Sequence, residues 1–155
     1  MAKKSAKVNT QPFWRFAFVL YCAVMLWLLF GRSQGWVSGV SYQEMLLSNI
    51  NLSPMLTIRN YWSIVRQGPE NPYFAHCLIN LLGNLLLFIP AGLLLAKVFP
   101  RQRNFFRFFI TCAGLIFFVE TVQLFTLLGS FDIDDLILNL AGMILGFIFF
   151  HTCSP

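Results

Sequence analysis

The stretch FDIDDLILNLAGMILG, residues 131–146, decides the fold class, because three acidic side chains stand at the start of an otherwise apolar run. Asp132, Asp134 and Asp135 are half of the six acidic residues in the chain. The apolar run continues to about residue 153, which is the length of roughly 20 residues that a membrane-spanning helix needs. Ionisable groups in a membrane are costly and usually face a partner or a wet cavity. The polar residues beside and within the apolar segments are therefore the first candidates for function.

The composition indicates an integral membrane protein. Of the 155 residues, 57% are hydrophobic and 11% are charged, with a mean hydropathy of +0.68, whereas soluble domains have about 25% charged residues. The net charge of +5 does not indicate nucleic-acid binding, because the basic residues stand beside apolar segments, as membrane topology requires. The four cysteines fall one per apolar segment without a CxxC pair, which favours small packing residues over metal ligands. We expect no cofactor.

Four apolar stretches are long enough to cross the hydrocarbon core, at residues 13–30, 76–99, 105–128 and about 133–153. The first follows a basic tail, residues 1–12. It is longer than the ~7–15 apolar residues of a signal peptide, and no cleavage motif follows it, so we expect an uncleaved first span. The sequence therefore predicts an all-α membrane protein of four transmembrane helices, with residues 13–155 as a single membrane domain.

The basic residues predict the orientation. Eight flank the start of the first span or the connection between the second and third spans, and three lie on the other side. The first group is Lys3, Lys4, Lys7, Arg15, Lys97, Arg101, Arg103 and Arg107, and the second is Arg32, Arg59 and Arg66. By the positive-inside rule both termini lie in the cytoplasm, and the 31–75 loop and the 129–132 turn lie outside. We expect a multi-pass protein of the bacterial cytoplasmic (inner) membrane.

The outer 31–75 loop contains an amphipathic segment. Ile58, Tyr61, Trp62 and Val65 recur at i, i+3, i+4 and i+7, which is a helical apolar stripe. Tyr and Trp favour the headgroup region of a membrane. The pattern predicts a helix that lies on the outer membrane surface.

Polar residues in three of the spans fall at a similar depth. Asn84 and Glu120 each lie eight residues, about 12 Å, from the outer ends of their spans. Residues three or four apart share a helix face, which pairs Asn80 with Asn84, Glu120 with Gln123, and Asp135 with Asn139. We therefore predict a polar pocket that opens to the outer side. The predicted binding residues are Asn80, Asn84, Glu120, Gln123, Asp132, Asp135, Asn139 and Arg59.

These residues also have structural interpretations. Asp132 is a good helix N-cap, and the helix dipole favours Asp134 and Asp135 in the first turn. The asparagines can join helices by hydrogen bonds. Glu120 is hardest to explain in this way, because a carboxylate deep in a membrane helix costs roughly 2.5–3.5 kcal/mol unless it is paired or protonated. Three glycines are interpreted as sites of close helix packing: Gly83, Gly142 and Gly146.

At these residues the chain resembles the VanZ-like family of bacterial membrane proteins, whose namesake confers low-level resistance to teicoplanin. The matching pieces, in the family's order, are NLSP at 51–54, NLLGN at 80–84 leading to FIPAG at 88–92, ETVQLF at 120–125, and SFDIDD at 130–135 with Asn139 and Gly142. The resemblance covers about residues 50–146 and implies a four-helix fold and a cell-envelope role without a mechanism. The family commonly has an arginine just before the Ser-Phe-Asp stretch, where this chain has Gly129. A charge partner for the acids is then missing, or is supplied by Arg59 or Arg66.

Three classes of function are left open. The favoured one is a non-catalytic envelope protein that binds an outer-leaflet amphiphile, either a lipid-linked wall precursor or the lipoglycopeptide itself, and lowers teicoplanin-type susceptibility. The second is an intramembrane enzyme on a lipid phosphate, in which Asp132, Asp134 and Asp135 hold Mg²⁺, an ion that prefers carboxylate and water ligands. No nucleophile–base pair is visible for it. The third is a small proton-coupled transporter or accessory subunit that uses Glu120. A second copy of the chain or another membrane protein is a further candidate partner.

Overall fold

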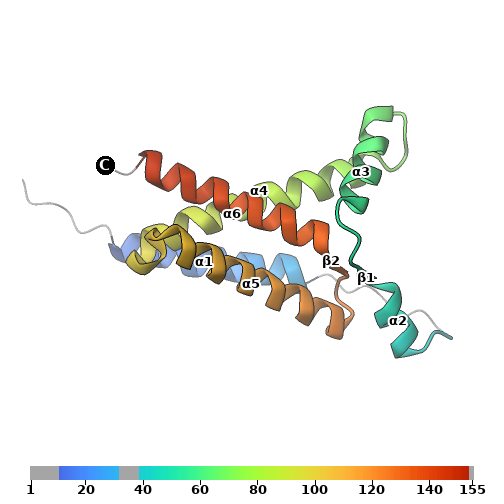
Figure 1. The fold of residues 1–155 in the computed structure, drawn as a ribbon, viewed down its shortest axis with the longest axis horizontal. Helices are drawn as coiled ribbons and strands as arrows, with labels where there is room; N and C mark the ends of the chain where they lie inside the picture. Colours follow the sequence, from blue (N-terminus) through green and yellow to red (C-terminus); the bar gives the residue numbers. More distant parts are fainter. Residues whose placement is uncertain (1–10, 32–38, 154–155) are drawn as a thin grey trace, which may run out of the picture.

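Four long helices form the molecule, and smaller elements gather at one end of them (Figure 1). The computed structural model describes residues 11–31 and 39–153. The long helices are α1 (Gln11–Phe30), α4 (Phe74–Val98), α5 (Phe105–Thr126) and α6 (Ile133–Cys153). Each is long and apolar enough to cross a membrane. The predicted all-α membrane fold with four spans is confirmed, and the bounds of these four long helices lie within two residues of the expected spans.

The smaller elements join the 39–67 segment to the start of α6. They are α2 (Tyr42–Ser48), β1 (Ile50–Asn51), α3 (Leu56–Gln67) and β2 (Phe131–Asp132), while the 3-10 helix η1 (Pro100–Arg103) links α4 to α5 at the opposite end. The predicted amphipathic helix is α3. Both α2 and the parallel β1–β2 pair were not predicted. A sequence signal for α2 existed, because Ser41 and Glu44 form the capping box that starts it.

Close backbone contact between α4 and α6 is made possible by glycines. A Cβ on Gly142 would lie 2.1 Å from the carbonyl oxygen of Leu85, and one on Gly146 would lie 2.0 Å from that of Ile89. Gly92 allows the same approach from the α4 side. The packing interpretation is confirmed for Gly142 and Gly146, because a side chain at either position would separate the two helices.

The same interpretation is wrong for Gly83. A Cβ at this position would meet no atom within 4 Å, and Gly83 lines a cavity between α1 and α4 instead of a helix contact. The spacing of small residues cannot tell these two environments apart, because either kind of surface accepts a glycine.

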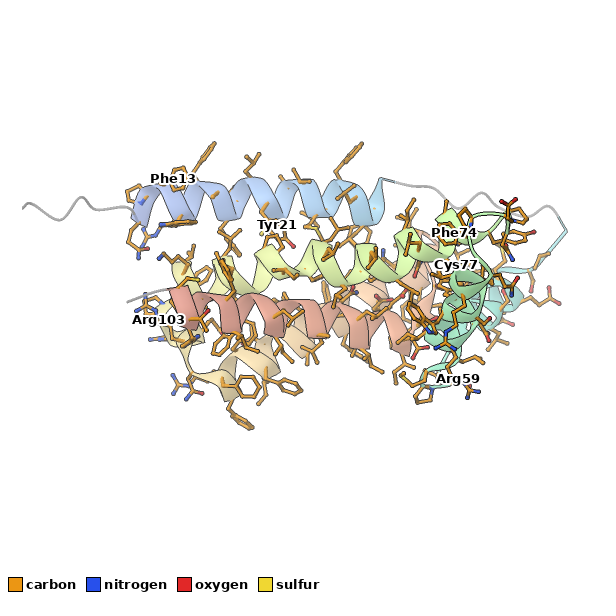
Figure 2. All side chains as sticks on the ribbon, turned by 90° about the horizontal axis from the view of Figure 1, so that it is seen from above. Phe13, Tyr21, Arg59, Phe74, Cys77 and Arg103 are labelled. Carbon is orange, nitrogen blue, oxygen red and sulfur yellow. The ribbon has the colours of Figure 1, made fainter. Side chains whose placement is uncertain are left out.

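The apolar core lies toward the η1 end, where Phe108 and Cys112 of α5 are fully buried. Helix α1 is held more loosely, since Met25 is its only buried residue among those described. The Tyr21 hydroxyl points toward α4 (Figure 2) and donates a 2.7 Å hydrogen bond to the Leu87 carbonyl. The spans α4, α5 and α6 therefore form the packed core, and α1 lies along the bundle with fewer buried contacts (Figure 2).

Basic side chains mark the η1 end of the bundle. The Lys97 ammonium lies 5.3 Å from the centre of the Trp14 ring, and the Arg103 guanidinium lies 5.5 Å from that of Phe150. Arg103 and Arg59 are at opposite ends of the molecule (Figure 2). Which end faces the cytoplasm stays a prediction. Lys3, Lys4, Lys7 and Arg32, with most of the basic tail, lie outside the described residues.

Candidate functional site

A cavity of about 440 Å³ lies where the four long helices meet, toward the end that carries α3. We call it the four-helix cavity. Its walls come from the last turn of α1, the first half of α4, the end of α5 with the following turn, and the start of α6. Six of the eight predicted binding residues line it: Asn80, Asn84, Glu120, Gln123, Asp135 and Asn139. The structure thus brings these residues together, while binding itself stays a prediction.

Two carboxyl groups belong to this wall. The amide of Asn84 donates to Oδ1 of Asp135 at 2.5 Å, and it also lies 3.5 Å from Oδ1 of Asn80. Glu120 is only 4% exposed, and the backbone of Asp132 hydrogen-bonds its carboxyl group. The charged groups that act on Glu120 are Asp135 and Asp132, both of the same sign. The wall is therefore acidic on the sides formed by α5 and α6.

The side-chain amides of Gln123 and Asn139 in the wall differ in their hydrogen bonding. Nε2 of Gln123 donates to the Leu29 carbonyl at 2.9 Å, which ties the end of α1 to α5. Asn139 is 3% exposed, and its Oδ1 has no hydrogen-bond partner within the described chain. An unsatisfied buried acceptor costs about 1–3 kcal/mol. The cavity wall therefore contains an acceptor without a donor.

Basic side chains are absent from the lining of this cavity, as far as the described residues go. Arg59, a predicted binding residue, lies in a separate groove of about 450 Å³ on α3, together with Trp62 and Arg66. The structure therefore does not bring either arginine to the cavity as a charge partner for its acids. Gly129 does line the cavity, so the position where the family pattern has an arginine is part of its wall.

Asp132 binds β1 and the first turn of α3, and it does not line the cavity. Its Oδ2 accepts hydrogen bonds from the hydroxyl of Thr57 at 2.6 Å and from the amide of Asn51 at 3.2 Å. Its Oδ1 accepts from the backbone N–H of Asp134 at 2.8 Å, which is the cap predicted from the sequence. Asp132 therefore both starts α6 and fixes residues 51–57 beside it.

Asp134 caps a helix other than its own. Its side chain is fully buried, and its two oxygens accept from the backbone N–H groups of Met55, at 2.5 Å, and Ile58, at 3.1 Å. Met55 is the N-cap residue of α3, adopts a left-handed conformation with φ of 64°, and offers no side-chain cap. The carboxylate of Asp134 thus replaces the missing cap and satisfies two free N–H groups of α3. The expectation that Asp134 serves the dipole of its own helix did not foresee this contact.

The VanZ/LLP1 family model matches residues 18–154 of the chain. The chain belongs to the VanZ/LLP1 family. This match confirms the family resemblance and extends it to most of α1, beyond the motifs found between residues 50 and 146. No curated protein and no solved structure matches the chain.

A magnesium set of Asp132, Asp134 and Asp135 is not assembled in this VanZ/LLP1 protein. Two of them bind the 51–58 segment, and the third binds Asn84. Within residues 11–31 and 39–153, no group of three or more His, Cys, Asp or Glu side chains could hold a metal ion. Asp132 and Asp134 therefore join α3 to α6, and Asp135 lines the cavity.

Helix α3 of this VanZ/LLP1 protein lies beside the three aspartates at the start of α6. Burial raises the pKa of the half-buried Tyr61 phenol, and the charge of Asp135 adds to this rise. The Tyr61 ring also contacts the ring of His76 edge-on at 6.0 Å between centroids. Thr57 was not predicted as a site residue, and Asn51 was assigned no role although it lies in the family's NLSP block. No pattern points to Thr57.

Proposed function

We propose that this VanZ/LLP1 protein is a non-catalytic envelope protein that binds an amphiphile from the outer leaflet of the bacterial cytoplasmic membrane. A lipid-linked wall precursor or a lipoglycopeptide is such an amphiphile, and binding it would lower susceptibility to teicoplanin-type antibiotics. The observation that carries the proposal is the four-helix cavity, whose volume of about 440 Å³ falls within the ~300–1,000 Å³ of ordinary ligand sites. Polar groups line it although it lies among membrane-spanning helices.

A neighbouring cavity supports an amphiphile rather than a wholly polar ligand. This second cavity, of about 400 Å³, lies between α1 and α4 and shares Asn80, Asn84, Leu28 and Leu29 with the first. Apolar side chains make up most of the rest of its wall, and Gly83 leaves room in it. A ligand with a polar head in the first cavity and an apolar chain in the second would fit this pair of spaces. The loose attachment of α1 gives such a ligand a way in from lipid.

A proton-coupled transporter is the second candidate, and one observation favours it. Glu120 is buried within a membrane-spanning helix, and Asp135, another titratable group, acts on it. Such groups form proton relays in transport proteins. The two candidates differ in what they require, because a relay needs a titratable group at position 120 and an amphiphile site needs open space in both cavities.

The deciding experiment fills the second cavity without touching a polar residue. Cells expressing wild type, Gly83→Phe or Gly83→Ala at equal levels are compared for teicoplanin susceptibility, and each purified protein is examined by native mass spectrometry for bound lipid. We expect Gly83→Phe to lose both the bound lipid and the protection, because its ring occupies the space for the chain. Gly83→Ala should keep both, since its methyl group meets nothing within 4 Å.

Folding of Gly83→Phe is checked by the protection of the buried Cys112 thiol. A folded Gly83→Phe protein that retains lipid and protects cells as well as wild type would contradict the proposal. If wild type itself leaves susceptibility unchanged while Gly83→Phe loses lipid, the antibiotic part is wrong and the binding part stands.

A further inference from the structure

We infer that the four-helix cavity takes a protonated primary amine, so that the amphiphile it binds is a lipid with an ammonium headgroup. This inference rests on the proposed function and names the chemistry of its ligand. It follows from three properties of the wall: its acidic side chains, the hydrogen-bonding groups it leaves unused, and the absence of a basic side chain at position 129.

The ionisable side chains in the wall are all acids. Asp135 and Asp132 both act on Glu120, and Asp132 also acts on Asp135. The described lining contains no Lys, Arg or His. Carboxyl groups that are buried together without a cation oppose one another's ionisation. A cation in the cavity would pair with both acids at once, whereas a phosphate would add a further negative charge.

The hydrogen-bonding groups of the wall point to the same ligand. Two of its amide donors are already used inside the protein, because Asn84 donates to Asp135 and Gln123 donates to the Leu29 carbonyl. Among the fully buried polar atoms of the wall, the one left without a partner is an acceptor, Oδ1 of Asn139. An ammonium group has three donors and no acceptor. It therefore supplies the donor that Asn139 lacks, while a phosphate oxygen would compete for the Asn84 and Gln123 donors that are already used.

Gly129 leaves its part of the wall without a cation of the protein. It lies in the cavity wall, and a Cβ added there would already be 3.2 Å from the Cβ of Gln123. A long basic side chain at this position would reach the cavity from its own wall. Gly129→Arg should then place a cation of the protein beside the acids and displace an ammonium ligand, whereas Gly129→Gln adds a polar side chain of similar reach without the charge.

The test uses the purified full-length protein in nanodiscs of phosphatidylglycerol, with increasing fractions of phosphatidylethanolamine of the same acyl chains. Bound lipid is counted by native mass spectrometry after release from the disc. We expect wild type to retain phosphatidylethanolamine at least tenfold over its share of the disc. Glu120→Gln and Asp135→Asn should lower this preference tenfold or more, because each removes a charge and keeps the shape of the side chain. Gly129→Arg should abolish the preference, and Gly129→Gln should retain it.

Several outcomes would overturn the inference. One is a wild-type protein that retains phosphatidylglycerol as well as phosphatidylethanolamine, and another is a preference that Glu120→Gln and Asp135→Asn leave within twofold. Arg32→Gln is made as well, because Arg32 follows the wall residue Leu29 by three positions in the sequence. A preference that changes in Arg32→Gln alone would make the chain's own arginine the governing charge. Free ethanolamine that replaces the lipid at equal concentration would assign the site to a soluble amine.

Failure of the inference can be told apart from failure of the proposed function. If Gly83→Phe loses all bound lipid while the charge variants keep their headgroup preference, the amphiphile site stands and its ammonium specificity is wrong. If Gly83→Phe retains lipid as wild type does, the amphiphile site itself is wrong.

Discussion

Removal of the Asp134 carboxylate should release α3 from the bundle without unfolding the spans. This side chain is fully buried and accepts two backbone N–H groups of α3, at Met55 and Ile58. Asp134→Asn keeps one oxygen and the volume, so one of the two N–H groups loses its acceptor. Asp134→Ala leaves both without one. Each unsatisfied buried donor costs about 1–3 kcal/mol, which is of the size of a lost helix cap, about 0.5–2 kcal/mol.

Two buried cysteines report on the two parts of the molecule separately. Cys77 is 1% exposed in the first turn of α4, at the end of the bundle that carries α3 (Figure 2). It is close enough to α3 to act on the phenol of Tyr61. Cys112 is 0% exposed and belongs to the apolar core toward η1. A protein in which Cys77 or Cys112 is the single cysteine left of the four is mixed in detergent with a thiol-reactive dye, and the labelling rate is followed. Because a local opening exposes a thiol in proportion to its equilibrium constant, the Cys77 rate reports on α3 and the Cys112 rate on the core.

We expect Asp134→Asn to speed Cys77 labelling by roughly 5- to 150-fold, since 1.4 kcal/mol corresponds to a factor of ten. Asp134→Ala should speed it further, and Cys112 labelling should change less than twofold in both. Glu44→Gln is the matched control, because it weakens the capping box of α2 and leaves α3 untouched. Unchanged Cys77 labelling in both Asp134 variants would refute the capping role. An equal rise at Cys77 and Cys112 would refute the separation of α3 from the core.

Two further predictions concern packing and orientation. Gly142→Ala should destabilise the protein by about 1–3 kcal/mol in a thermal unfolding assay, because its Cβ would lie 2.1 Å from the Leu85 carbonyl oxygen. The control Gly83→Ala should leave the unfolding temperature unchanged, and equal unfolding temperatures of the two variants would contradict the close contact of α4 and α6. A reporter fused near Arg103 should read cytoplasmic and one near Gly68 external, because basic residues cluster around η1, and the reversed pattern would move the four-helix cavity to the cytoplasmic leaflet.

The spans could be predicted from the sequence because the membrane leaves few choices. A run of about 20 apolar residues has to form a helix if all its backbone groups are to be satisfied in lipid. The depth of Asn84 and Glu120 then follows from counting residues, and both lie in the wall of one cavity. The periodicity of residues 58–65 gave α3 for the same reason, since an apolar stripe at i, i+3, i+4 and i+7 fits one face of a helix.

The joint between α3 and α6 could not be predicted in this way. Its parallel pairing involves only Ile50–Asn51 and Phe131–Asp132, two residues on each side and about 80 positions apart. Such a short pairing produces no periodic pattern. A carboxylate that caps a helix of another segment also looks, in the sequence, like one that serves its own helix. The apolar stripe of α3 does not tell whether Arg59 reaches the cavity, and the structure places it in the separate groove with Trp62 and Arg66.

Asp134 and Asp135 have different neighbours because of helix geometry. Successive residues of an α-helix point about 100° apart, so Asp134 and Asp135, although adjacent, serve different neighbours. Asp134 holds α3, and Asp135 lies in the cavity wall on the same side of α6 as Asn139. The two are still linked, because α3 carries Tyr61 close enough for the Asp135 charge to act on its phenol. Loss of the Asp134 cap should therefore weaken ligand retention as well, although Asp134 does not line the cavity. Its effect should scale with the opening that Cys77 reports, whereas the effect of Asp135→Asn should appear with Cys77 fully protected.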